Sequence, residues 1–183
     1  MNDIDNLLST SRRIHMVGIG GAGMFPLAEI LHAKGYKLSG SDNNESDILK
    51  RVRKLGIPVF LGHAAENIGD ADMLVQTAAL LPGNPEIEEA NRRGIPVFSR
   101  AELFGAVSRH FENCIAVSGT HGKTTVTSMI VHILYLAGKD PSAVIGGKLP
   151  LIDSYGRIGE SEIFVGEACE FANTFLHLSP ACS

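Results

Sequence analysis

A glycine-rich segment in the second half of the chain has the residue types that bind phosphate. Residues 119–125 read Gly-Thr-His-Gly-Lys-Thr-Thr, after an apolar run at 114–117 and before an apolar stretch that predicts a helix over about 124–137. A strand, a glycine turn and a helix in this order form the context that a phosphate-binding loop requires. Gly119 and Gly122 let the backbone turn its N–H groups inward, and the helix adds the positive end of its dipole.

The side chains of this loop complete the predicted phosphate site. Lys123 is a mobile cation for the outer phosphates, and the Thr124 hydroxyl suits a phosphate-bound Mg²⁺. His121 has two open roles, a phosphate contact or packing. Val117 stands where the general pattern has its first glycine, so we interpret the loop as a shortened variant. The candidate phosphate-binding residues are Gly119, Thr120, His121, Gly122, Lys123, Thr124 and Thr125.

A second glycine-rich segment lies near the N-terminus. Residues 18–23 have the spacing G-x-G-x-x-G after an apolar run, and a helical pattern then continues to Gly35. A strand over 36–41 ends at Asp42, about twenty residues after the glycines, where dinucleotide-binding folds place the acid that holds a ribose. This spacing indicates an NAD site, and the same geometry would serve the pyrophosphate and ribose or uracil of a UDP-sugar equally well. The candidates are Gly20, Gly21, Ala22, Gly23, Ser41 and Asp42, with Gln76 and Thr77 as weaker ones.

The remaining pattern predicts an α/β fold built on parallel sheets. Gly-Ile-Pro-Val-Phe occurs at 56–60 and again at 94–98, each time as a glycine helix stop followed by a short strand. Between them, 73–76 predicts a strand, and Asn84-Pro85-Glu86 predicts a helix start with an acid near the positive dipole end. Residues 99–102 have the spacing of a capping box. We interpret His15, His32 and His63 as structural.

We predict two domains with a boundary near residue 110, namely a Rossmann-like domain over 1–110 and the first part of a P-loop ATPase domain over 111–183. The second domain has predicted strands at 114–117, 142–145 and 163–165, a turn at Gly146-Gly147 and an irregular loop over 148–161. Three strands leave a sheet edge unprotected, so we expect this half to be less stable than the first.

Composition narrows the classes of function. The 183 residues are 44% hydrophobic and 20% charged with a formal net charge of −4, which provides no basic surface for nucleic acid. The three cysteines, Cys114, Cys169 and Cys182, lack metal-ligand spacing and indicate reduced thiols in a cytoplasmic protein. No apolar stretch has the length needed to span a bilayer, and we predict no membrane partner.

The two glycine-rich segments resemble those of the Mur ligase family, which builds the peptide of bacterial cell-wall precursors. The ATP loop of that family is similar to residues 119–125, and its first glycine motif is similar to residues 14–24 followed by 39–42. Further similarity runs through residues 84–86, 100–102 and 175–178, so it covers nearly the whole chain. Within the family, the resemblance favours the branch that joins L-alanine to UDP-N-acetylmuramate. It implies ATP and Mg²⁺ as cofactors and these two compounds as substrates.

The resemblance also implies residue roles. Family members phosphorylate a substrate carboxylate with ATP, and an amine then attacks the acyl phosphate. Lys123 would be the catalytic contact to the outer phosphates, and Thr124 and Glu167 the metal ligands. The UDP-sugar would lie against residues 20–23 and 41–42. The family usually has Glu-Ala-Asp-Glu-Ser-Asp where this chain has Cys169, Phe171 and Ala172, so the substrate contacts at those three positions are not carried over.

Family members continue beyond the point that corresponds to residue 183, so we expect these residues alone to bind nucleotide without forming the amide bond. Two alternatives stay open. One is a sibling ligase that attaches a whole peptide to the same UDP-sugar. The other is an NAD-binding oxidoreductase or sensor built on the N-terminal glycines, which would leave the second loop unused.

Overall fold

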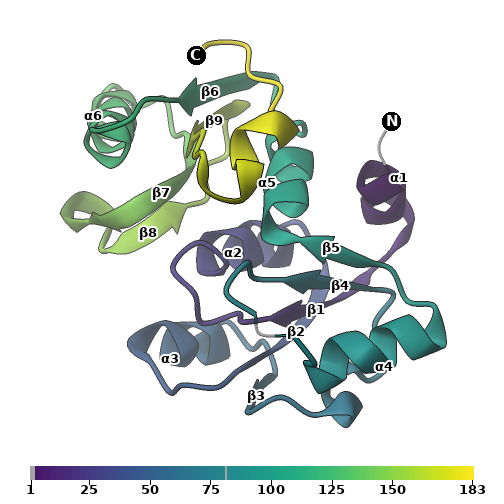
Figure 1. Ribbon diagram of the computed structural model, residues 1–183. Coiled ribbons are helices and arrows are strands. Elements are labelled where there is room, and N and C mark those ends of the chain that lie inside the picture. The colour runs from purple at the N-terminus through teal and green to yellow at the C-terminus, as the bar shows by residue number, and fades with distance from the viewer. Residues whose placement is uncertain (1–2, 81) are drawn as a thin grey trace. The chain divides into compact units, whose positions relative to one another are not determined.

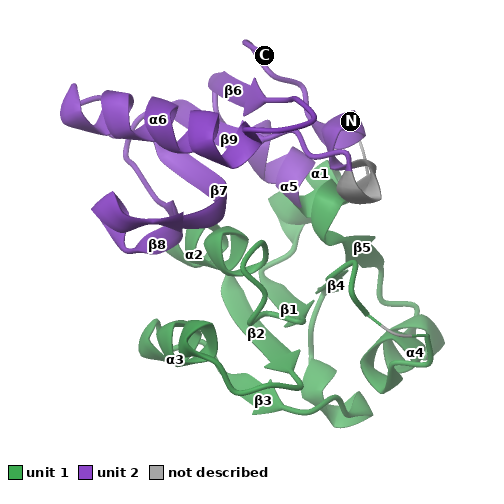
Figure 2. Ribbon diagram, turned by 60° about the vertical axis from the view of Figure 1, so that its left-hand side comes forward, with its two compact units in different colours: residues 1–103 green, residues 104–183 purple. Residues whose placement is uncertain are grey.

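The computed structural model describes residues 3–80 and 82–183, except the side chains of residue 3 and of residues 171–173 (Figure 1). The chain divides into two compact units, Met1–Leu103 and Phe104–Ser183, which are coloured separately in Figure 2. Each unit contains its own sheet with helices packed against it, so the predicted α/β class is confirmed.

The first unit contains a five-stranded parallel sheet in the order β3-β2-β1-β4-β5. Its strands are β1 (Arg13–Val17), β2 (Lys37–Asp42), β3 (Val59–Leu61), β4 (Met73–Gln76) and β5 (Val97–Ser99). The chain leaves β1 toward β2 and β3, and then returns to the other side of β1 with β4. This reversal creates a topological switch point between β1 and β4, beside which open α/β sheets bind ligands.

The helices of the first unit begin and end where local signals place them. They are α1 (Asp3–Thr10), α2 (Phe25–Ala33), α3 (Asp47–Lys54), the 3₁₀ helix Ala65–Ile68, α4 (Pro85–Arg93) and α5 (Arg100–Ser108), the last of which continues into the second unit. Asn84 Oδ1 accepts hydrogen bonds from the amides of Glu86 and Ile87, at 2.9 and 3.3 Å, which confirms the predicted start of α4. The capping box is also confirmed, because Ser99 and Glu102 bond to each other's amides at 2.7 and 3.2 Å.

The central strands of this unit are buried on both faces. Met73, Leu74 and Val75 of β4 are fully buried, as are Met16 and Val17 of β1. Val17 and Leu74 pack with Ile68 and Ala90, so the 3₁₀ helix and α4 cover one face of the sheet. Continuous apolar strands are expected in a parallel sheet covered on both sides. His15 of β1 is a polar exception in these apolar strands, and it is also fully buried.

The second unit contains a four-stranded sheet in the order β6-β9-β7-β8. Its elements are β6 (Asn113–Val117), α6 (Lys123–Leu136), β7 (Ser142–Leu149), the 3₁₀ helix Pro150–Ile152, β8 (Ser154–Arg157), β9 (Ile163–Glu167) and the 3₁₀ helix Phe171–His177. Val131 of α6 packs on Ala143, Ile145 and Val165, so this helix covers one face of the sheet.

Two predictions for the second unit were wrong. Gly146 and Gly147 do not form a turn, because β7 continues through them to Leu149, and residues 148–161 are not an irregular loop, because β8 pairs antiparallel with β7. The physical reason is close packing. A Cβ on Gly146 would lie 2.8 Å from Glu167 Oε2, and one on Gly147 would lie 3.0 Å from Thr124 Cγ2, so glycine serves close approach here.

Candidate functional site

The segment 118–122 joins β6 to α6 and has the conformation of a glycine turn. Gly119 has φ +140° and Gly122 has φ +79°, values that favour glycine strongly. The segment is exposed to solvent, and α6 begins at Lys123 immediately after it. Thr120 and His121 are exposed within the turn, and Thr125 lies in the first turn of α6. The predicted strand, turn and helix are therefore all present, with the free amides of a helix N-terminus beside an open loop.

Lys123 is held over this turn by two hydrogen bonds. Its Nζ donates to the carbonyl oxygen of Gly119 at 2.7 Å and to Glu170 Oε2 at 2.8 Å. The hydrogen bond that Lys123 donates to Glu170 raises the pKa of the lysine and lowers the pKa of Glu170. Glu170 is well exposed at 68%, whereas the lysine side chain is only 12% exposed. The lysine is therefore charged, and its acidic partner lies largely in solvent.

Thr124 and Glu167, the two predicted metal ligands, lie side by side. Thr124 Oγ1 donates to Glu167 Oε2 at 3.2 Å, and the Gly146 amide donates to Glu167 Oε1 at 2.7 Å. A hydroxyl and a carboxylate are hard oxygen donors, which suit Mg²⁺ when phosphate oxygens and water supply the other ligands. Within the described residues, no group of three or more His, Cys, Asp or Glu side chains is placed to hold a metal. The donor set therefore fits a metal that arrives bound to phosphate.

A groove of about 520 Å³ borders this region along the first turns of α6. Its lining combines apolar side chains with a lysine and several hydroxyls: Thr124, Thr125, Ser128, Met129, His132, Ile133, Lys148, Leu149 and Pro150. Thr124 therefore faces both Glu167 and an open groove.

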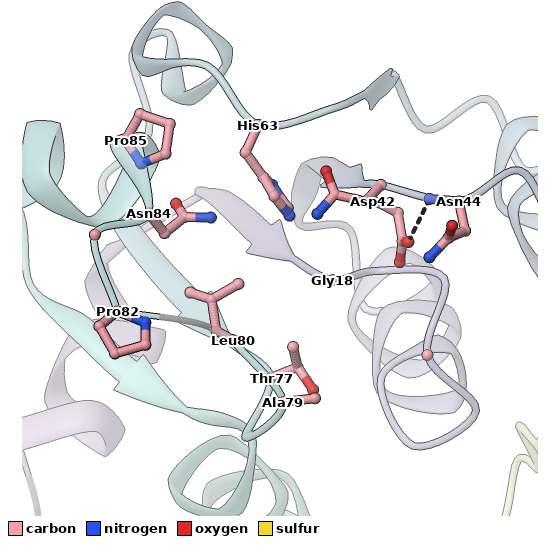
Figure 3. Close-up of a pocket in the computed structure, with 13 residues that line it drawn as sticks. Gly18, Asp42, Asn44, His63, Thr77, Ala79, Leu80, Pro82, Asn84 and Pro85 are labelled. Carbon is pink, nitrogen blue, oxygen red and sulfur yellow. Dashed lines mark hydrogen bonds between the residues drawn. The ribbon is translucent and has the colours of Figure 1, made fainter.

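The first unit has a pocket of about 420 Å³ at the carboxyl ends of β1, β2 and β4 (Figure 3). It is lined by Gly18, Gly21, Asp42, Asn43, Asn44, His63, Thr77, Ala79, Leu80, Pro82, Gly83, Asn84 and Pro85. Of the predicted sugar-nucleotide residues, Gly21, Asp42 and Thr77 line the pocket. The pocket lies at the switch point of the sheet, where the order of strands predicts a ligand site.

The other predicted residues of this unit lie around the pocket without lining it. The Gly20 amide donates to Asp42 Oδ2 at 3.0 Å, which orients the carboxylate. Ala22 and Gly23 continue the turn toward α2, and Gln76 pairs with its neighbours inside the sheet. Ser41 is fully buried, so its side chain lies beneath the pocket and not at its surface.

A buried polar cluster lies beneath the pocket, and the sequence did not indicate it. Glu86 is fully buried, and Ser41 Oγ donates to its Oε2 at 2.6 Å. Asn67 Nδ2 donates to Glu86 Oε1 at 2.7 Å, and His63 Nδ1 lies 3.0 Å from Oε2. His15 Nε2 lies 3.6 Å from Oε1, longer than a hydrogen bond.

These neighbours keep the Glu86 carboxyl ionised. Burial raises its pKa, but the adjacent His15 ring and the hydrogen bonds donated by Ser41 and Asn67 outweigh that effect and lower the pKa to about 2. Sequence reasoning treated Glu86 as an ordinary acid at a helix start and His63 as structural. The positions of Glu86 and His63 in the sequence could have indicated a site. Both residues follow strands, at the carboxyl edge of the sheet where ligands bind.

Comparison with known protein families gives a match to "Mur ligase family, catalytic domain" over residues 13–112. Two curated relatives are UDP-N-acetylmuramate–L-alanine ligases. The one from Clostridium botulinum (strain Langeland) is 43% identical over 176 residues, which are 96% of this chain and 38% of the relative. The one from Agathobacter rectalis is 48% identical over 171 residues, which are 93% of this chain and 37% of the relative. The chain thus spans less than two-fifths of the length of these relatives.

Two solved structures have the same fold over most of the chain. UDP-N-acetylmuramate-alanine ligase MurC from Thermotoga maritima aligns with a TM-score of 0.85 and 35% identity, covering 92% of this chain and 39% of that one. The UDP-N-acetylmuramate:L-alanyl-gamma-D-glutamyl-meso-diaminopimelate ligase from Neisseria meningitides aligns with a TM-score of 0.85 and 30% identity. This alignment covers 94% of this chain and 59% of that one.

No helix among the described residues has both the length and the apolar character needed to cross a membrane.

Proposed function

This chain belongs to the Mur ligase family. We propose that its function is that of an ATP-dependent ligase, which joins L-alanine to the carboxylate of UDP-N-acetylmuramate. The observation that supports this proposal is that one chain contains two candidate anion sites. One is the pocket at the switch point of the first sheet, and the other is the lysine-bearing turn of the second unit. Relatives that are 43% and 48% identical over more than nine-tenths of the chain bear the name of this ligase, which supports the choice of substrates.

The proposed reaction proceeds through an acyl phosphate because a free carboxylate is a poor electrophile. A carboxylate oxygen of the UDP-sugar attacks the γ-phosphorus of ATP, and ADP leaves. The amine of L-alanine then attacks the acyl carbon, phosphate departs with that oxygen, and the nitrogen loses a proton to give the amide. Lys123 is the proposed catalytic residue, since a cation beside the transferred phosphate offsets the charge that develops there.

The turn at 118–122 and the first turn of α6 are the proposed ATP site. Backbone amides of Gly119, Thr120, His121, Gly122, Lys123, Thr124 and Thr125 would surround the phosphates. Thr124 and Glu167 would hold Mg²⁺, which supplies positive charge to the phosphate oxygens when it is bound. Glu170 would release Lys123 as the phosphates arrive.

The pocket of the first unit is the proposed site of UDP-N-acetylmuramate. The amides of residues 18–21 already donate within the protein, so those of Ala22 and Gly23 would be the donors of this turn to the pyrophosphate, and Asp42 would accept from a ribose hydroxyl. Thr77 faces the same space from the end of β4. The fold alone matches an alanine ligase and a peptide ligase equally, with a TM-score of 0.85 for each, so the preference for L-alanine rests on the higher sequence identity to alanine ligases. Consumption of ATP and a nucleotide sugar fits a cytoplasmic protein.

Calorimetric titration with MgATP tests the turn at 118–122. Lys123→Ala removes a charge-assisted hydrogen bond, so affinity should fall about tenfold or more, corresponding to about 1.5–3 kcal/mol. Lys139→Ala is the matched control, because this lysine is exposed beyond the other end of α6. An unchanged affinity in Lys123→Ala would show that this lysine does not contact the phosphates.

A thermal-shift comparison tests the choice of ligands. A ligand that binds only the folded state raises the melting temperature by mass action. We expect UDP-N-acetylmuramate and MgATP to raise it, and NADH to leave it unchanged. Stabilisation by NADH without stabilisation by the UDP-sugar would support the NAD-binding alternative and refute the ligase.

A further inference from the structure

The contacts of Glu86, Ser41 and His63 form a triangle whose protons can be assigned. Ser41 Oγ and His63 Nδ1 both lie within hydrogen-bond distance of Glu86 Oε2, at 2.6 and 3.0 Å, and Ser41 Oγ lies 3.0 Å from His63 Nδ1. The low pKa of Glu86 means that this carboxylate carries no proton at neutral pH, so it can only accept. Any group in contact with Oε2 must therefore donate to it.

Only one arrangement of protons satisfies all three contacts. The single hydroxyl proton of Ser41 is used on Glu86 Oε2. If His63 Nδ1 lacked a proton, its lone pair would face the carboxylate at 3.0 Å without compensation, which is costly in a buried site. With a proton, Nδ1 donates to Glu86, and the free lone pairs of Ser41 Oγ are available to the same proton. A neutral His63 ring therefore carries its proton on Nδ1 and leaves a lone pair on Nε2.

The His63 ring connects this buried cluster to the pocket. Its side chain is 12% exposed, and it lines the pocket together with Asp42, Leu80 and Asn84. Figure 3 shows the ring extending from the loop after β3 toward the space between these side chains. Both hydrogen bonds of the ring within the described residues use Nδ1, so Nε2 is the atom that it can offer to a ligand.

We propose that Glu86 and Ser41 fix His63 with its proton on Nδ1, so that Nε2 is a hydrogen-bond acceptor that recognises an N–H or O–H donor of the bound nucleoside. This inference rests on the proposed UDP-sugar site and deepens it. A uridine nucleotide has two kinds of such donor, the imide N–H of the base and the ribose hydroxyls. A phosphate at neutral pH offers acceptors to this position, so its contacts fall to the glycine turn instead.

The inference gives the buried charge a role. An ionised carboxylate without exposure is expensive to bury, and an apolar residue of similar size often stabilises a protein as well or better. Glu86 is a positioning residue in this account, because it acts on the ligand only through His63. Within the described residues, His15 from β1 and Asn67 from the 3₁₀ helix face the other carboxylate oxygen, and Asp42 lines the same pocket as His63.

The tautomer can be measured directly on the unaltered protein. Long-range ¹H–¹⁵N spectra distinguish a protonated Nδ1 from a protonated Nε2, and at about pH 8.5 an ordinary imidazole is neutral. We expect the His63 signals to show the proton on Nδ1. A proton on Nε2 would overturn the inference without any ligand or variant.

Binding of nucleotide analogues to matched variants tests the recognition itself. His63→Asn places an amide donor near the position of Nδ1 and removes Nε2, whereas His63→Gln places a polar group near Nε2 and loses the donor to Glu86. The ligands are UDP, N3-methyl-UDP, which lacks the imide N–H, and 2′-deoxy- and 3′-deoxy-UDP, which each lack one hydroxyl. In the unaltered protein one analogue should bind at least about tenfold more weakly than UDP, and in His63→Asn that analogue and UDP should bind alike.

The outcomes separate this inference from the proposed function. Failure of the unaltered protein to bind UDP or UDP-N-acetylmuramate refutes the UDP-sugar site itself. Binding with the same discrimination among the four nucleotides in the unaltered protein and His63→Asn keeps the site and refutes the role of His63. The identity of the affected analogue assigns the donor to the base or to the ribose. If His63→Asn does not fold, the tautomer measurement still decides.

Discussion

Replacing Glu86 with glutamine removes one buried charge while it keeps the size of the side chain. An amide offers one acceptor oxygen and one donor nitrogen, whereas the carboxylate accepts from Ser41 on one oxygen and from Asn67 on the other. One of these two donors must therefore face the amide nitrogen. Burial opposes the charge of Glu86, but its donors outweigh burial and lower the pKa from 4.5 to about 2. At 1.36 kcal/mol per pKa unit, this lowering of the pKa corresponds to about 3 kcal/mol of folding stability at neutral pH, which the Glu86→Gln protein should lack.

The lowered pKa of Glu86 also predicts how the folding stability changes with pH. The pKa of Glu86 is lower in the folded state, so its stabilisation is complete above the unfolded value of 4.5 and is lost as the pH falls toward about 2. The difference in unfolding free energy between the unaltered protein and Glu86→Gln should therefore be largest above about pH 5. By about pH 3 it should be smaller by about 2 kcal/mol.

Hydrogen exchange measured by mass spectrometry is the suitable assay, because it reports on the first unit separately from the second. Peptides that contain β1 and β4 give the unfolding free energy of the sheet core at each pH, after correction for intrinsic exchange rates. Glu88→Gln is the matched control, since Glu88 lies exposed on the same helix and should change stability by less than about 0.5 kcal/mol. Equal stability of the unaltered protein and Glu86→Gln at pH 7, or a difference that does not shrink by pH 3, would refute this account of the cluster.

Three further predictions concern the second unit. Gly146→Ala places a Cβ 2.8 Å from Glu167 Oε2 and 3.0 Å from Thr124 Oγ1. The Mg²⁺ concentration needed for ATP binding should therefore rise about tenfold in a calorimetric titration. An unchanged Mg²⁺ requirement would show that Thr124 and Glu167 do not bind the metal. Phe164→Ala empties a fully buried position between two phenylalanine rings and should lower the unfolding free energy by about 3–5 kcal/mol in urea denaturation, whereas Phe175→Ala, at an exposed position, should cost far less. Strand amides of the second unit should exchange faster than those of the first, because most exposed large apolar side chains of the described chain lie in the second unit; uniformly slow exchange would contradict this.

Sequence alone determined the features that depend on neighbouring residues. The start of α4 at Asn84 and Pro85, the capping box at 99–102 and the glycine stops after α3 and α4 involve residues within a few positions of each other. Their hydrogen bonds form between adjacent parts of the backbone, so the signal is local. The strand, glycine turn and helix around Lys123 were predictable for the same reason, as was the parallel α/β class from the alternation of strands and helices.

Tertiary structure alone decided which distant residues meet. Ser41 and Glu86 are separated by 45 positions, and Thr124 and Glu167 by 43, yet each pair shares a hydrogen bond. Nothing local distinguishes the buried Glu86 from an exposed acid at a helix start, because the direction of its side chain depends on strands that come from elsewhere in the chain. Gly146 resembles a turn residue in the sequence and lies within a strand in the fold, because the space a side chain would need is taken by Glu167. The helix ends could thus be predicted because their hydrogen bonds are local, whereas the candidate sites depend on packing between segments that are distant in the sequence.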